Sequence, residues 1–234
     1  MPGFSVVIPT LQRADELHPL VEMCAAHPRV VEVLVINNAP EPLVWDSSKV
    51  RVLQQDGNIF VNPAWNLGAR EARGEHLAIL NDDILFDPRL FDVMHRWLRL
   101  PFIGMIGPHE TSFVDGPWKP SFRPAYRRTW GFGCAMFLRR ENYVPIPQDL
   151  EIFYGDDWLF SHQRRRNLVF RGMPIRTEFE VTSGEYSPRG ERELKIYRGL
   201  PEGAYGARFA REEQWYRKLV DLASSVKRRI PSRR

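Results

Sequence analysis

The stretch HLAILNDDILFDP, residues 76–88, places two adjacent carboxylates directly behind a short apolar run. The run His76–Leu80 predicts a buried strand, and Asn81, Asp82 and Asp83 follow it. Adjacent carboxylates repel each other, so a fold tolerates them best where solvent or a cation offsets their charge. The stretch therefore predicts either a solvated turn or a cation-binding site, and its surroundings have to distinguish the two.

Apolar runs alternate with helical periodicity through the first hundred residues. This pattern is typical of a mainly parallel sheet with helices on both faces. We expect Pro19 to delay the start of the first helix, and Asn62 to cap the second helix with Pro63 in its first turn. The predicted strands are Phe4–Ile8, Val30–Ile36, Val50–Leu53 and His76–Leu80, and the predicted helices are Ala14–His27 and Asn62–Arg73.

Polar residues follow three of these strands, as Pro9-Thr10, Asn37-Asn38 and Asn81-Asp82-Asp83. Ligands of parallel sheets bind outside the carboxyl ends of the strands. If the strands lie parallel, these three groups meet at one edge of the sheet. Their convergence favours a ligand site over a simple solvated turn.

The composition is that of a soluble globular protein, with 234 residues that are 43% hydrophobic and 26% charged. Two cysteines, Cys24 and Cys134, are too few for a disulfide framework or a cysteine zinc site, so we expect core residues and a reducing compartment, the cytoplasm. No stretch approaches the roughly 18 apolar residues of a membrane span, and no signal peptide is evident at the N-terminus.

The net charge is +4, and much of the excess lies in SSVKRRIPSRR, residues 224–234. Such a tail suits a nucleic acid or peripheral contact with an anionic membrane, and it also suits a merely solubilising role. Just before it, Glu212–Val226 has amphipathic spacing, so it predicts a helix packed on the domain or lying on a membrane surface.

The second half of the sequence is less regular. A strand is expected in TWGFGCAMFLRR, residues 129–140, and another over Val169–Ile175. DDWLFSHQRRR, residues 156–166, predicts a helix with acids in its first turn and basic residues in its last, as the helix dipole favours. Ser183–Glu193 carries turn residues and charge but little apolar content, which predicts a mobile loop that donor binding would order.

Taken together, five stretches in order resemble the family 2 glycosyltransferases, which have the GT-A fold. They are SVVIPT, VEVLVINNAP, GNIFVNPAWNLGAREARGEHLAILNDD, WGFGCAMFLRRENY and FYGDDWLF, and they span roughly residues 4–165. The resemblance implies a sugar-nucleotide donor, transfer with inversion and a divalent metal, Mn²⁺ or Mg²⁺. It divides the chain into a nucleotide-sugar half at 1–100, an acceptor-binding half at 101–200 and a helix with a basic tail at 201–234.

The resemblance also assigns roles to residues. Asp83 matches the metal ligand, and a hard cation held by carboxylates would stabilise a departing diphosphate. Asp82 has either a nucleotide contact or a turn role, and Arg13 either a nucleotide contact or a surface ion pair. The nucleotide-sugar contacts implied are Pro9, Thr10, Arg13, Asn37, Asn38, Asn58, Asn66, Asn81 and Asp82.

Two positions depart from the family pattern. Asn37 stands where an aspartate usually contacts the nucleotide, and an amide both donates and accepts, so uridine and thymidine diphosphates remain alternatives. Asn81 replaces the first acid of the metal motif. A histidine usual after the paired acids is missing, and Arg189, Arg192 or Lys195 is a candidate to neutralise the diphosphate instead.

Inverting transfer needs a general base that takes the proton of the acceptor hydroxyl. Asp156-Asp157 matches the paired acids of the family, with Asp157 expected to act as the base and Asp156 as a helix cap. Trp130, Gly131 and Trp158 are the acceptor-binding candidates. A core position is the alternative for either tryptophan, and Trp158 slightly favours it.

The acceptor implied is a glycan, a lipid-linked sugar or a modified nucleic-acid base. Two rival functions use similar residues: a nucleotidyltransferase, and a non-catalytic protein that binds sugar nucleotides or glycans. The basic tracts Arg164–Arg166 and Lys227–Arg229 suit phosphate backbones and anionic lipids alike.

Overall fold

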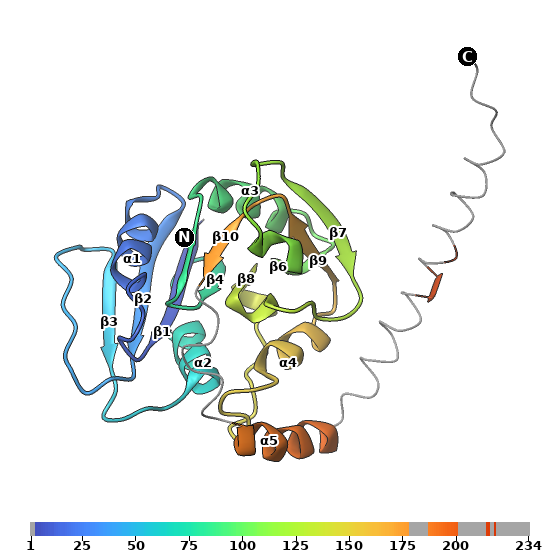
Figure 1. The fold of residues 1–234 in the computed structure, drawn as a ribbon. Helices are drawn as coiled ribbons and strands as arrows, with labels where there is room; N and C mark the ends of the chain where they lie inside the picture. Colours follow the sequence, from blue (N-terminus) through green and yellow to red (C-terminus); the bar gives the residue numbers. More distant parts are fainter. Residues whose placement is uncertain (1–2, 178–186, 201–213, 216–217, 219–234) are drawn as a thin grey trace.

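The computed structural model describes residues 3–177, 187–200, 214, 215 and 218, and its core is an eight-stranded sheet with the order β3-β2-β1-β4-β8-β6-β9-β7 (Figure 1). A second, two-stranded sheet pairs β5 with β10. The strands are β1 Phe4–Thr10, β2 Val30–Asn37, β3 Val50–Gln54, β4 His76–Leu80, β5 Ile84–Phe86, β6 Ile103–Pro108, β7 Ser121–Ala125, β8 Ala135–Arg139, β9 Arg166–Arg171 and β10 Ile175–Thr177.

The sheet joins a parallel half to a mixed half. Strands β3, β2, β1 and β4 run parallel, with Thr10 opposite Asn37, so that their polar ends share one edge. Strand β8 is inserted antiparallel between β4 and β6, and β7 pairs antiparallel with β9. The predicted mainly parallel α/β sheet is therefore confirmed.

Helices cover both faces of the sheet, because alternate strand residues point to opposite sides. Phe4, Val6 and Ile8 pack with α1 and α3, whereas Val7 packs with α2 and α4. The helices are α1 Leu17–Ala26, α2 Val61–Glu71, α3 Arg89–Leu98, α4 Gly155–Ser161 and α5 Ser187–Gly199, with short 3₁₀ turns η1 Glu110–Phe113, η2 Phe132–Cys134 and η3 Arg140–Asn142. Among the described residues, no helix has both the length and the apolar character needed to cross a membrane.

The start of α2 differs from the prediction. Phe60, with φ 66°, precedes the helix and makes no side-chain cap. Asn62 lies inside the first turn, and its Nδ2 donates to the carbonyls of Leu150 and Phe153, both at 3.1 Å. Capping by Asn62 is thus wrong, because its amide is used to hold a loop about ninety residues further along the chain.

The predicted mobile loop is also corrected in part. Residues 183–186 lie outside the described residues, but Ser187 begins α5, so the stretch up to Glu193 is helical. Glu193 is buried, with 1% exposed, which shows that this segment does have a side chain to bury. The predicted helix Glu212–Val226 and the basic tail fall almost entirely outside the described residues.

Candidate active site

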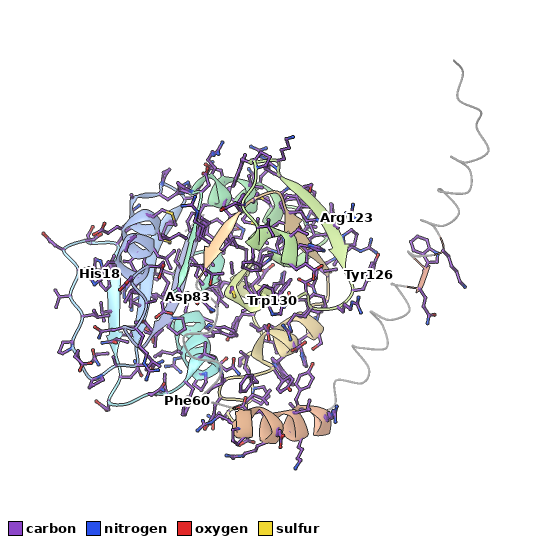
Figure 2. The ribbon with its side chains drawn as sticks, viewed as in Figure 1. His18, Phe60, Asp83, Arg123, Tyr126 and Trp130 are labelled. Atoms are coloured by element: carbon purple, nitrogen blue, oxygen red, sulfur yellow. The ribbon has the colours of Figure 1, made fainter. Side chains whose placement is uncertain are left out.

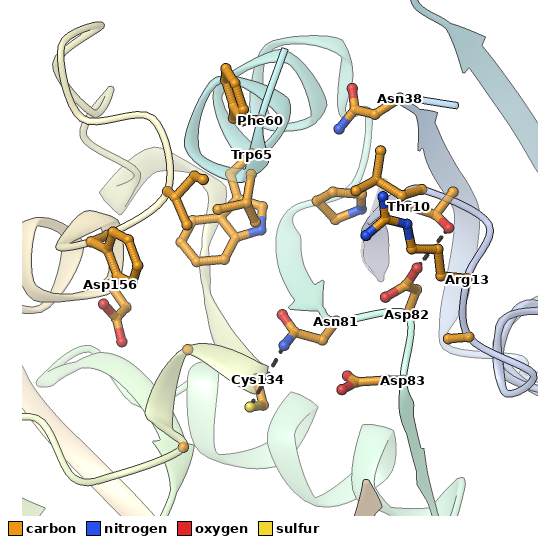
Figure 3. A pocket seen from close by; sticks show the side chains of 18 of the residues that line it. Thr10, Arg13, Asn38, Phe60, Trp65, Asn81, Asp82, Asp83, Cys134 and Asp156 are labelled. Atoms are coloured by element: carbon orange, nitrogen blue, oxygen red, sulfur yellow. Dashed lines mark hydrogen bonds between the residues drawn. The ribbon is translucent and has the colours of Figure 1, made fainter. Parts of the chain in front are cut away.

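A pocket of about 550 Å³ opens at the polar edge of the sheet, between the ends of β1 and β4 and the start of α4 (Figure 3). It brings together eleven of the residues predicted from the sequence. They are Pro9, Thr10, Arg13, Asn38, Asn58, Asn81, Asp82, Asp83, Gly131, Asp156 and Asp157.

Thr10 and Asp82 tie the ends of the two central strands together. The Thr10 hydroxyl donates to Asp82 Oδ2 at 2.6 Å and accepts from the backbone N–H of Gln12 at 2.8 Å. Burial raises the pKa of Asp82, and the hydrogen bond from Thr10 acts against that rise. Asp82 is therefore engaged in a structural contact while it lines the pocket.

Only one of the two carboxylate oxygens of Asp83 has a hydrogen-bond partner among the described residues. Its Oδ2 accepts from Thr177 at 3.3 Å, whereas its Oδ1 is buried and has no hydrogen-bond partner among the described residues. Burial, followed by the charge of Asp82, raises the pKa of Asp83 to about 6. An unpartnered buried carboxylate oxygen is a group for which a cation or a ligand proton would compensate.

The fit of a divalent cation can be judged from this donor set. Within the described residues, no cluster of three or more His, Cys, Asp or Glu side chains lies close enough to hold a metal. Mg²⁺ is commonly held by only one or two carboxylates together with substrate phosphates and water. Asn81 turns its Nδ2 toward Cys134 Sγ at 3.7 Å, which leaves its oxygen for the pocket (Figure 3). Asp83 and Asn81 therefore fit a cation that arrives with a diphosphate.

The acid pair lies in the first turn of α4. Asp156 Oδ1 accepts from the backbone N–H of Asp157 at 3.0 Å, and its Oδ2 is 3.3 Å from Arg128 Nη1. Asp157 Oδ2 is 2.9 Å from Arg128 Nε. Arg128 also lines the pocket. Burial raises the pKa of Asp156, and the charge of Arg128 acts against that rise.

Two elements fix the loop that presents these acids. Glu193 of α5 accepts from the backbone N–H groups of Ile152 and Phe153, at 3.1 and 2.8 Å. From the other side, Asn62 binds the loop carbonyls, and a Cβ at Gly155 would lie only 2.0 Å from Asn62 Oδ1. The loop geometry thus depends on α2 and α5 together, and on a glycine where α4 begins.

Aromatic side chains that the sequence analysis did not single out line the pocket: Phe60, Trp65, Phe153 and Tyr154. Tyr197 of α5 stacks on Tyr154, with ring centroids 5.1 Å apart. Phe60 lies toward α5 (Figure 2), and the guanidinium of Arg189 stands over its ring at 4.1 Å. Aromatic residues at these positions had no sequence signal beyond their apolar character.

The predicted phosphate role of the α5 cations is not supported by their positions. Arg189 pairs with Glu151 as well as lying over Phe60, and it does not line the pocket. Arg192 and Lys195 are exposed on the helix and are not among the lining residues.

Asn37 is not among the residues that line the pocket, because its side chain is fully used elsewhere. Its Oδ1 accepts from Gln12 Nε2 and from the backbone N–H of Ala39, both at 3.1 Å. Its Nδ2 donates to the Glu41 carbonyl at 2.7 Å and to Gln54 Oε1 at 2.6 Å. A nucleotide could contact Asn37 only by displacing one of these bonds.

Asn66 is likewise placed away from the pocket. It donates to the carbonyl of Ile146 and accepts from the Ile146 N–H, both at 2.9 Å, and it accepts from the Tyr143 hydroxyl at 2.8 Å. Asn66 therefore anchors the segment that precedes α4, and a nucleotide could contact it only by displacing one of these bonds.

The two tryptophans predicted to bind the acceptor also lie outside the lining of the pocket. Trp158 donates its indole N–H to the Pro145 carbonyl at 3.1 Å and stacks on His162. Trp130 is 57% exposed and meets Phe113 edge-on, next to Gly131, which does line the pocket.

Comparisons with known proteins agree with this architecture. The fold is similar to that of the S. aureus TarS 1–349 crystal structure, with a TM-score of 0.54 and 14% identity over 71% of this chain and 57% of that one. It is also similar to GalNAc-T7 with UDP, GalNAc and Mn²⁺, with a TM-score of 0.54 and 13% identity over 77% of this chain and 44% of that one. The chain thus spans about half the length of these GT-A glycosyltransferases.

Sequence comparison gives the family. Among curated proteins, no sequence matches significantly. The family model described as Glycosyl transferase family 2 matches residues 5–143, which is more than half of the chain. The chain therefore belongs to glycosyl transferase family 2 and has the GT-A fold.

Proposed function

We propose that the protein transfers a sugar, with inversion, from a uridine or thymidine diphosphate donor to a hydroxyl group of an acceptor. The observation that supports this most is one pocket that holds the polar strand ends on one side and the acid pair on the other. A nucleoside diphosphate sugar has a charged diphosphate at one end and a reacting anomeric carbon next to it. The polar strand ends suit the diphosphate, and the acid pair suits the reaction at the anomeric carbon. Family membership and the GT-A fold agree with it.

On the donor side, Asp83 and Asn81 would hold Mn²⁺ or Mg²⁺. When bound, such an ion stabilises the negative charge that develops on the departing nucleoside diphosphate. Thr10 and Asp82 keep the ends of β1 and β4 at a fixed distance, and Arg13 lies on the same side of the pocket (Figure 3). Asn38 lines this side too, and its buried Oδ1 has no partner among the described residues.

On the acceptor side, Asp157 is the better placed general base. Both oxygens of Asp156 are engaged, by a backbone N–H and by Arg128. The described residues give Asp157 a partner at Oδ2 alone, so its Oδ1 is available to an acceptor hydroxyl. The hydroxyl proton would pass to Asp157 Oδ1 while the hydroxyl oxygen attacks the anomeric carbon. The bond from that carbon to the diphosphate would break, and the nucleoside diphosphate would leave with the bonding electrons.

The aromatic side chains that line the pocket support a sugar acceptor, because aromatic faces pack well against the apolar faces of sugar rings. A glycan, a lipid-linked sugar and a glycosylated or modified nucleic-acid base all offer such a hydroxyl. Contact with a membrane or a nucleic acid through the basic tracts belongs to the same proposal, although Lys227–Arg229 lies outside the described residues.

Calorimetry tests the donor side. UDP or dTDP should bind in the presence of Mn²⁺, and chelator or Asp83→Ala should greatly weaken binding while the fold survives. Unchanged binding in both cases would refute the metal role of Asp83.

Proton NMR of the released sugar tests inversion. The first anomer formed from an α-linked donor should be β, before mutarotation. Asp157→Asn should slow transfer by roughly 10²–10⁴-fold with near-normal donor affinity, since it keeps the size of the side chain but cannot take the proton. A loss below tenfold would exclude Asp157 as the base.

A further inference from the structure

Arg128 links both acids of the pair through one guanidinium group. It lies between β7 and η2, where its Nε is 2.9 Å from Asp157 Oδ2 and its Nη1 is 3.3 Å from Asp156 Oδ2. The side chain is 34% exposed and lines the pocket. Because a guanidinium is planar and rigid, two such contacts define the orientation of both carboxylates.

The contact to Asp157 has a directional consequence. A carboxylate with one oxygen held at 2.9 Å cannot rotate freely about its last bond. Its other oxygen then keeps one direction relative to the pocket, which a general base needs in order to reach a particular hydroxyl. Asp156 is less suited to this role, since the N–H of Asp157 and Arg128 each contact one of its two oxygens.

Arg128 also sets the charge at this end of the pocket. Two neighbouring carboxylates would carry a charge of −2, and Arg128 reduces it to −1. The other titratable groups around the pair are Tyr197 of α5, which acts on Arg128, and Cys134, which lies between Asp156 and Asp83 (Figure 3). Burial raises the pKa of the Cys134 thiol to about 12, so the thiol adds no charge at neutral pH. Among the described residues, Arg128 is the cation that contacts both acids.

We propose that Arg128 is a positioning residue for transfer, which fixes both carboxylates of the Asp156–Asp157 pair and turns one oxygen of Asp157 toward the acceptor hydroxyl. The inference rests on the proposed function, because it assigns Asp157 as the base. It also specifies the acceptor end of the substrate as an uncharged hydroxyl, since a site with a net negative charge disfavours an anionic group there.

The test compares Arg128→Gln, which removes the charge, with Arg128→Lys, which keeps the charge but loses the two-point contact. Arg29→Gln is the matched control, because Arg29 pairs with Asp92 at 3.3 Å on an exposed surface that does not line the pocket. Each variant is assayed for UDP affinity by calorimetry and for the pH dependence of donor hydrolysis. The carboxyl ¹³C signals of labelled aspartates are titrated in parallel. The variants Asp156→Asn and Asp157→Asn identify which signal belongs to which residue of the pair.

We expect Arg128→Gln to move the acid limb of the pH–rate profile upward by about 1–3 pH units, because a nearby cation favours the charged form of a carboxylate. The titration of the Asp156 signal should move in the same direction, since the charge of Arg128 acts against the rise in its pKa. UDP affinity should stay near that of the unchanged protein. Arg128→Lys should give a smaller pH shift but still a lower kcat at high pH, and Arg29→Gln should change neither quantity.

An unchanged titration of the acid pair in Arg128→Gln would overturn the inference. So would a uniform loss of rate at all pH values, which indicates a purely structural role. If the unchanged protein neither binds UDP nor hydrolyses a donor, the proposed function fails, whereas the NMR titration still decides whether Arg128 controls the pair.

Discussion

Replacing Asp83 by asparagine should stabilise the ligand-free protein while it removes the candidate cation ligand. The carboxyl of Asp83 is buried, and one of its oxygens has no partner among the described residues. Burial and the charge of Asp82 raise its pKa from 3.8 to about 6. Since the raised pKa means that the ionised form is disfavoured in the folded state, the charge opposes folding at neutral pH.

The size of the effect follows from the pKa. A rise from 3.8 to about 6 means that ionised Asp83 lowers the free energy of unfolding by about 3 kcal/mol at pH 7. Asparagine keeps an acceptor for Thr177, which lies 3.3 Å from Oδ2, and removes the charge. Because 1 kcal/mol shifts Tm by about 2–4 °C in a chain of this length, Asp83→Asn should raise Tm by up to about 6–12 °C.

The assay is thermal unfolding without metal or nucleotide, followed by circular dichroism from pH 4 to pH 8. The gain should be full well above pH 6 and shrink to a small fraction by pH 4, because folded Asp83 is protonated below its pKa of about 6, whereas unfolded Asp83 is fully protonated only below 3.8.

Asp87→Asn is the control of opposite sign. The hydrogen bond from Arg89 lowers the pKa of Asp87, so its charged form favours folding above its unfolded pKa, and the substitution should lower Tm slightly. A Tm for Asp83→Asn that is equal to or below that of the unchanged protein at pH 7.5 would refute the reasoning, as would a gain that persists undiminished at pH 4.

Mn²⁺-dependent UDP binding should weaken as pH falls through about 6, because a cation competes with the proton on Asp83. The measurement is calorimetry at constant ionic strength, and a UDP affinity that stays constant from pH 5 to pH 8 would contradict the prediction. Glu193→Ala leaves two buried N–H groups of the 150–154 loop unpaired and should cost about 1–3 kcal/mol, together with faster amide exchange there; unaltered exchange would show that the loop does not depend on α5. Asn66→Ala should lower Tm yet leave UDP affinity intact, and a selective loss of affinity would restore its predicted nucleotide role.

The first half of the fold was predictable because its signals are local. Four apolar runs became β1, β2, β3 and β4, and residues from the polar ends of three of them, β1, β2 and β4, met in one pocket as the parallel arrangement requires. The insertion of β8 between β4 and β6 was not predictable, since the pairing of Ala78 with Phe137 joins residues far apart in the sequence.

The site was predictable only where residue type alone carries the chemistry. Asp83 and Asp157 stood out as adjacent acids behind a strand and at a helix start. Arg128 did not, because an arginine in an irregular segment has no pattern, and its role comes from two contacts made after folding. For Asn66 the sequence could not show its contacts: the amide suits a nucleotide, and in the folded chain it binds Ile146.

Product analysis by ³¹P NMR tests the central claim most directly. The protein is incubated with UDP-sugars and dTDP-sugars in the presence of Mn²⁺, without an added acceptor, beside the Asp157→Asn variant. The account predicts slow release of UDP or dTDP together with free sugar by the unchanged protein, and a much lower rate for the variant. Release of pyrophosphate would contradict it in favour of a nucleotidyltransferase, and binding without any turnover across the donors would contradict it in favour of a sugar-nucleotide binding protein.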